Sequence, residues 1–256
     1  SAQEFVGENG FKGIRISTRP DAVDGEICDI LEKYHVTAVE LGAQSTNDKV
    51  LAMNRRGHTR EDIFRSARLL KDRGFELGLQ MMTGLYGSND EDSIGTARDI
   101  ISLSPDTARI YPTVVIENTE LAELYRNGEY RPQTPEEAAV LCAKILPLFE
   151  RAGIKVIRLG LHSGGDVEGS FVAGAYHPAL REMCEGHIYF DIINRALSGK
   201  EKGKYIIYVA PREVSKASGQ RRCNIEKLRE LGYECRIKEN AALSARDITL
   251  EKVNLL

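Results

Sequence analysis

The chain has 256 residues, of which 42% are hydrophobic and 29% charged, a composition ordinary for a soluble globular protein of one large or two small domains. The net charge of -3 excludes binding of nucleic acid through overall charge, and no apolar run reaches the length of a membrane span. The five cysteines are far apart and odd in number, which excludes a secreted disulfide framework and indicates reduced thiols in the cytoplasm.

Strand and helix patterns alternate from residue 12 to residue 161. Short apolar or alternating runs predict five strands, over residues 12–18, 36–41, 75–82, 107–115 and 155–161. Apolar residues at helical spacing predict the helices between them, over residues 21–34, 59–74, 90–102 and 135–153, with caps at Asp21 and Thr59. This alternation favours a parallel sheet with right-handed crossovers, and therefore an α/β fold.

The remaining residues, 163–256, are predicted to form a second region that begins in a loop at Ser163–Asp166. Its expected elements are a helix and a small βαβ-like unit, over residues 175–197, 204–210, 220–231 and 233–238. Twelve Lys or Arg and five Glu between Arg195 and Lys238 predict a basic surface. We expect an anion site, suited to an RNA phosphate, at Lys216, Ser218, Arg221 and Arg222, where a helix begins. A merely solvated basic face is the alternative.

Four segments that combine polar residues with apolar runs stand at the ends of predicted strands. They are Ile16–Asp21, Glu40–Ser45, Gln80–Leu85 and Ile110–Val115. In barrels built from repeated βα units, the C-terminal strand ends and the loops after them carry the chemistry. The sequence therefore predicts the functional site at these four segments.

The order and the amino-acid sequences of these segments resemble those of the radical S-adenosylmethionine (SAM) superfamily. The resemblance is strongest to the catalytic subunits of Elongator complexes and weaker to the oxygen-independent coproporphyrinogen III oxidases. The likeness runs from about Gly13 to Leu161 and rests on Thr-Arg-Pro-Asp (18–21), Glu-Leu-Gly-Ala-Gln-Ser (40–45), Arg-Gly-His-Thr (56–59), Met-Met-Thr-Gly-Leu (81–85) and Tyr-Pro-Thr-Val-Val-Ile (111–116). It implies an incomplete TIM-like (βα) barrel over residues 1–162, with SAM across the C-terminal strand ends. It also implies a [4Fe–4S] cluster and reductive cleavage of SAM to a 5′-deoxyadenosyl radical.

The same resemblance suggests which side chains face SAM: Ser17, Gln44, Arg56 and Gln80. Arginine can bind the methionine carboxylate through a bidentate pair, and glutamine amides can bind ribose hydroxyls or the carboxylate. We expect Arg19 and Tyr111 to line the same cavity. For His58 the sequence leaves open a capping or surface role and a role as proton donor.

Two parts of the family pattern have no counterpart in this sequence: the cluster-binding cysteine loop and the glycine-rich strand end that follows it. No two cysteines have CxxC or CxxxCxxC spacing, so we expect the cluster in a full-length form and not in this chain, which we expect to be inactive as given. A start without Met or a signal peptide suggests that residues before Ser1 have been lost; a natural protein without a cluster is the alternative. A barrel short of two strands predicts an open sheet and self-association through its edges.

The leading hypothesis is a cytoplasmic radical SAM enzyme, with SAM as ligand, transfer RNA as a candidate substrate and no membrane partner. The alternative is a non-catalytic RNA-binding or scaffold protein that uses the basic C-terminal unit. A TIM-barrel enzyme without a cluster is a third hypothesis, but these residues yield no convergent acid, base or metal set for it.

Overall fold

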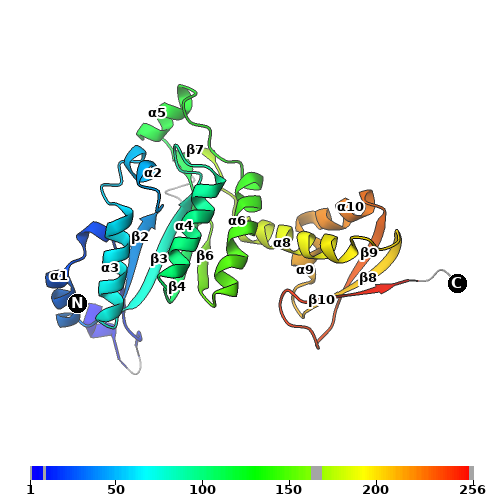
Figure 1. The fold of residues 1–256 in the computed structure, drawn as a ribbon, viewed down its shortest axis with the longest axis horizontal. Helices are drawn as coiled ribbons and strands as arrows, with labels where there is room; N and C mark the ends of the chain where they lie inside the picture. The colour runs from blue at the N-terminus through cyan, green and yellow to red at the C-terminus, as the bar shows by residue number, and fades with distance from the viewer. Residues whose placement is uncertain (1, 8–9, 163–168, 254–256) are drawn as a thin grey trace. The chain divides into compact units, whose positions relative to one another are not determined.

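The computed structural model describes residues 2–7, 10–162 and 169–253, which fall into two compact units over residues 1–178 and 179–256 (Figure 1). The predicted boundary after residue 162 adjoins residues 163–168, which lie outside the described residues, and it stays a prediction.

A five-stranded parallel sheet organises the first unit. Its strands, in spatial order, are β1 (Ile14–Thr18), β2 (Val36–Gln44), β3 (Glu76–Thr83), β4 (Thr107–Pro112) and β6 (Lys155–Leu159). The predicted α/β class and parallel strands are therefore confirmed. Within the described residues β1 and β6 each pair on one side only, so the sheet is open rather than a closed barrel.

Helices cover one face of this sheet. They are α1 (Gly25–Lys33), α3 (Arg60–Asp72), α4 (Asp90–Ser102) and α6 (Pro135–Arg151), of which α3, α4 and α6 lie side by side, whereas the short helix α2 (Asp48–Met53) lies beyond the end of β2 (Figure 1). The strand residues that face them are apolar and almost fully buried, among them Leu41, Leu77, Leu79 and Ile110. Burial of each such side chain stabilises the unit by about 1.5–3 kcal/mol.

Side-chain caps determine where these helices begin. Capping boxes pair Thr59 with Asp62 at α3, Asn89 with Asp92 at α4 and Thr134 with Glu137 at α6. The prediction that Asp21 caps the first helix is wrong. Asp24 is the cap and accepts a bond from Ile27 N, because Asp21 lies in a preceding 3-10 turn, η2 (Pro20–Ala22).

The predicted strand over residues 107–115 is divided into two. Pro112 has no N–H to donate, and the last bonds to β3 are made by Thr113, whose N and Oγ1 both donate to Thr83 O, at 2.9 and 2.7 Å. The chain then forms β5 (Val114–Ile116), which pairs antiparallel with β7 (Phe171–Gly174), a strand that the sequence did not reveal. Helix α5 (Glu120–Arg126) packs on β5.

The second unit contains a three-stranded sheet in the order β10 (Ile248–Lys252), β8 (Gly203–Val209), β9 (Tyr233–Glu239). β8 and β9 are parallel, as the predicted βαβ pattern requires, whereas β10 is antiparallel to β8 and was not predicted. Its helices are α8 (Leu180–Leu197), α9 (Val214–Ser218), a 3-10 turn η3 (Gln220–Arg222) and α10 (Cys223–Glu230). The helix predicted over 220–231 begins only at Cys223, since Arg221 and Arg222 have left-handed backbone conformations.

Candidate functional site

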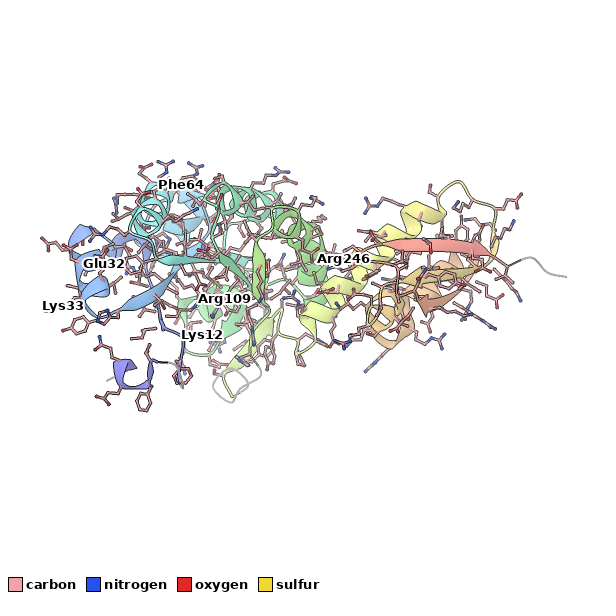
Figure 2. All side chains as sticks on the ribbon, turned by 90° about the horizontal axis from the view of Figure 1, so that it is seen from below. Lys12, Glu32, Lys33, Phe64, Arg109 and Arg246 are labelled. Carbon is pink, nitrogen blue, oxygen red and sulfur yellow. The ribbon has the colours of Figure 1, made fainter. Side chains whose placement is uncertain are left out.

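The face of the five-stranded sheet that lies opposite α3 and α4 is polar; we call it the inner face. Residues that are register partners on neighbouring strands point to the same face of the sheet. One such row on the inner face consists of Gly42, Gln80, Arg109 and Arg158. Figure 2 labels Arg109 on this side of the sheet and Phe64, which belongs to α3, on the other side. Several of the predicted site residues therefore lie on one surface at the C-terminal strand ends.

Two of the residues that the family resemblance suggested for SAM are in contact. Gln80 Nε2 donates to Gln44 Oε1 at 3.2 Å. A register shift between Gly42 and Gln44, together with a left-handed backbone at Gln44 (φ 63°), folds the 5%-exposed Gln44 side chain back beside its own strand. Glycine at position 42 leaves room for this arrangement, because a Cβ atom there would lie 2.7 Å from Gln44 Nε2 and would displace the Gln44 amide.

Arg56 is a half-buried cation without an anion. Its Nε is buried and has no hydrogen-bond partner, and the described residues offer it no carboxylate. Burial, and then the neighbouring charge of Arg19, lowers the pKa of Arg56. Arg19 itself is bound by Asp21, at 3.0 Å from Nε and 2.5 Å from Nη2, and this pair lowers the pKa of Asp21.

The structure brings Arg19 and Arg56 together at this end of the sheet. Gly57 makes the approach possible, since a Cβ atom there would lie 2.9 Å from Arg19 Nη2. An anion with two oxygens, such as a carboxylate, would match the charge of the half-buried Arg56 guanidinium.

His58 is neither a surface residue nor a helix cap. It is buried, its Nε2 lies 3.1 Å from Ala43 O, and Thr59 supplies the cap of α3. Because a carbonyl only accepts, Nε2 carries the proton in this bond, while the buried Nδ1 has no partner among the described residues. His58 thus ties the Arg56 loop to the end of β2.

Ser17 and Tyr111 lie on the same inner face without joining the glutamine pair. Ser17 is exposed on the edge strand β1, at the level of Glu40, and makes no side-chain hydrogen bond within the described residues. The Tyr111 hydroxyl accepts a bond from Arg109 Nη1 at 3.3 Å.

Sequence reasoning missed the ionic layer on the inner face. Glu40 is 3% exposed, and its Oε2 lies 2.8 Å from Arg109 Nε and 4.0 Å from Arg15 Nη1. Gly78 leaves room for this layer, because a Cβ atom there would lie 3.2 Å from Arg15 Nη1 and 3.3 Å from Glu40 Cγ. The signal was weak but available: β1, β2 and β4 each carry one charged residue, Arg15, Glu40 and Arg109, between apolar neighbours.

The described residues fit SAM better than they fit an iron–sulfur cluster. The unpaired Arg56 Nε and the adjoining Gln44–Gln80 amides supply the donors and acceptors that a carboxylate and a ribose require. No group of three His, Cys, Asp or Glu side chains in the described part of the chain could hold a metal ion. Burial raises the pKa of Cys142 to about 12 and that of Cys235 to about 11, so these two thiols are protonated and unreactive at neutral pH.

In the second unit, the four residues of the predicted anion site have different surroundings. Lys216 Nζ lies 2.7 Å from Glu213 and 3.3 Å from Glu185, so its charge is balanced inside the unit. Ser218 ends the short helix α9, whereas the exposed Arg221 and Arg222 form the turn before α10. Anion binding at these residues stays a prediction.

Comparison with protein families and with solved structures identifies the family and the fold of this chain. Residues 2–100 match the family described as the radical SAM superfamily, and residues 105–189 match the Radical_SAM C-terminal domain. Together these ranges take in well over half of the chain, which therefore belongs to the radical SAM superfamily.

The relatives of this chain include proteins named as tRNA uridine(34) acetyltransferase and as Elongator complex protein 3. The tRNA uridine(34) acetyltransferase of Methanocaldococcus jannaschii is 39% identical over 142 residues, 53% of this chain and 26% of that protein. The Elongator complex protein 3 of Homo sapiens is 36% identical over 146 residues, 53% of this chain and 25% of that protein. The chain thus spans about a quarter of the length of these relatives.

A solved structure supports the same relationship. The Methanocaldococcus infernus Elp3 with N-terminus deletion (1–46) superposes with a TM-score of 0.59 at 28% identity, covering 70% of this chain and 46% of that one. The predicted family resemblance and barrel-like α/β fold are confirmed. None of the helices in the described residues has both the length and the apolar character needed to cross a bilayer.

Proposed function

We propose that this chain is the SAM-binding part of a radical SAM enzyme that modifies transfer RNA. The observation that carries the proposal is Arg56, a half-buried guanidinium whose Nε lacks a partner, at the strand ends where Gln44 and Gln80 meet. The relatives named as tRNA uridine(34) acetyltransferases support transfer RNA as the substrate class.

Each residue has a separate task in this proposal. Arg56 binds the methionine carboxylate, and Gln44 and Gln80 bind the carboxylate or the ribose hydroxyls. Gly42 keeps the Gln44 amide in place, and His58 positions the loop that carries Arg56. In a full-length form that also held a [4Fe–4S] cluster, these residues would hold the SAM, and the cluster would supply the electron for its reductive cleavage.

The cluster does not fit the cysteines of this sequence, which are too far apart to ligate one iron–sulfur centre. A cluster would need thiolates from outside these 256 residues. We propose that this chain binds SAM without cleaving it, and that the full-length enzyme acts in the cytoplasm.

Calorimetric titration of SAM into this chain tests the proposal. Arg56→Gln should weaken binding about tenfold or more, since a charge-assisted pair contributes about 1.5–3 kcal/mol. Its unfolding temperature should not fall, because Arg56 has no partner to lose in the folded unit. The matched control is Arg55→Gln, whose side chain is 78% exposed and paired with Glu120. Absence of saturable SAM binding, or equal binding by both variants, would reject the proposal.

A second candidate function is RNA binding by the second unit. One groove of about 880 Å³ in that unit has the basic lining residues Lys202, Lys204, Arg229 and Lys252, against the single acid Glu234. Transfer RNA should then bind with an affinity that falls steeply with salt, because each phosphate contact releases counterions. Fluorescence anisotropy at several salt concentrations measures this slope, and an affinity that salt does not change would exclude it.

A further inference from the structure

The row of inner-face residues beside Gln80 contains two arginines, Arg109 and Arg158, which are partners in the register of β4 and β6. Both are half-buried. Neighbouring strands are about 4.8 Å apart, so the two guanidinium groups can reach the same small ligand.

The Arg109 guanidinium is held in place by its neighbours, but not all of its hydrogen-bond donors have a partner among the described residues. Its Nε lies 2.8 Å from Glu40 Oε2, and its Nη1 donates to the Tyr111 hydroxyl at 3.3 Å. Burial alone would lower the pKa of Arg109, but Tyr111 and Glu40 outweigh it and raise the pKa. Its Nη2 has no partner among the described residues, so one donor nitrogen of a fixed guanidinium is available.

Arg158 has still fewer partners. Its Nε donates to Gly160 O at 3.2 Å, and no carboxylate among the described residues lies within ion-pair distance. Arg15, on the same face, differs because Glu76, Glu40 and Thr107 all contact it. Arg15 therefore has a structural role, whereas the positive charge of Arg158 is unmatched within the part of the chain that the structure describes.

Among the described residues, the charges of this face do not balance. Three arginines (Arg15, Arg109 and Arg158) lie on it with two carboxylates (Glu40 and Glu76), and both carboxylates are already engaged by Arg15 or Arg109. A half-buried cation without a counter-ion is costly, and an anion with two or more oxygens would satisfy both guanidinium groups.

We propose that Arg109 and Arg158, with the Tyr111 hydroxyl, bind an anionic group of the substrate, a phosphate or a carboxylate, beside the SAM position at Gln80. Only the assignment of this anion to the substrate rests on the proposed function. The anion site itself depends on the geometry of β4 and β6 and needs no SAM.

Nuclear magnetic resonance of the arginine Nε–Hε groups tests the site on this chain without SAM. Inorganic phosphate and acetate are titrated separately at constant ionic strength. The signals of Arg109 and Arg158 should move and saturate, and Arg158→Gln should weaken the binding about tenfold. The control is Arg68→Gln, an exposed arginine on α3, which should bind like the wild type.

Each outcome has a separate meaning. Tighter binding of phosphate indicates a phosphorylated substrate group, and tighter binding of acetate indicates a carboxylate group. Signals that move without saturation, or an Arg158→Gln variant that binds like the Arg68→Gln control, would overturn the anion site. Saturable phosphate binding together with failed SAM binding would keep the anion site and reject the proposed function.

Discussion

Substitution of Glu40 by Gln tests the ionic layer of the inner face. The change removes the charge that lies 2.8 Å from Arg109 Nε and 4.0 Å from Arg15 Nη1 and keeps the size of the side chain. Breaking a fully buried ion pair from one side costs about 3–5 kcal/mol. Since both arginine side chains are 31% exposed, water replaces part of the lost interaction, and we expect a loss of about 2 kcal/mol.

Scanning calorimetry measures this loss. For a unit of this size about 1 kcal/mol lowers the unfolding temperature by about 2–4 °C, so the transition of the first unit should fall by about 4–8 °C. Glu76→Gln is the matched control, because Glu76 is more exposed and contacts only the edge of the layer; it should cost less than about 1 kcal/mol.

The Glu40→Gln variant should also bind phosphate more tightly, since Arg109 loses its only carboxylate within the described residues. An unfolding temperature within about 1 °C of the wild type, far below the expected shift, would refute the ion-pair reasoning. Weaker phosphate binding by Glu40→Gln would instead show that Glu40 serves mainly to orient Arg109.

Three further predictions concern other parts of the chain. Gly42→Ala should displace the Gln44 amide, 2.7 Å from the new Cβ, and weaken SAM binding in calorimetry with little loss of stability. Urea denaturation should show stability declining as pH rises from the ordinary thiol pKa of 9.0 towards the folded value of about 12, because the unfolded Cys142 loses its proton first; Cys142→Ala should lessen the decline. The unpaired edges of β1 and β6 should give concentration-dependent association in analytical ultracentrifugation, and a monomer at every concentration would contradict this.

The elements of the first unit were largely predictable because apolar periodicity and capping chemistry agree there. Thr59 caps α3 and the five parallel strands lie where apolar runs predicted them. The predicted element boundaries were wrong where a local contact or a proline outweighed the apolar pattern of the sequence. Asp21 is bound by Arg19 and leaves the cap to Asp24, and Pro112 ends β4 before the apolar run ends.

The site was predictable only in part. Gln44 and Gln80 belong to the polar segments at the ends of β2 and β3, so the parallel order of these strands places them on neighbouring strands. The inward turn of Gln44 depends on a register shift, and the buried position of His58 depends on a loop path, and neither has a local sequence signal. Glu40 and Arg109 pair across strands whose register only the folded sheet determines.

The capping boxes at α3, α4 and α6 have a consequence for how this protein can recognise phosphate. Proteins of alternating strands and helices often bind phosphate with the unpaired N–H groups of a helix N-terminus. Here Thr59, Asn89 and Thr134 already accept bonds from those first turns, and each first turn also carries acidic residues that repel an anion. Recognition of a negative charge at this end of the sheet is thus left to the guanidinium side chains. Exchanging those arginines could change the preferred ligand without rebuilding a single helix.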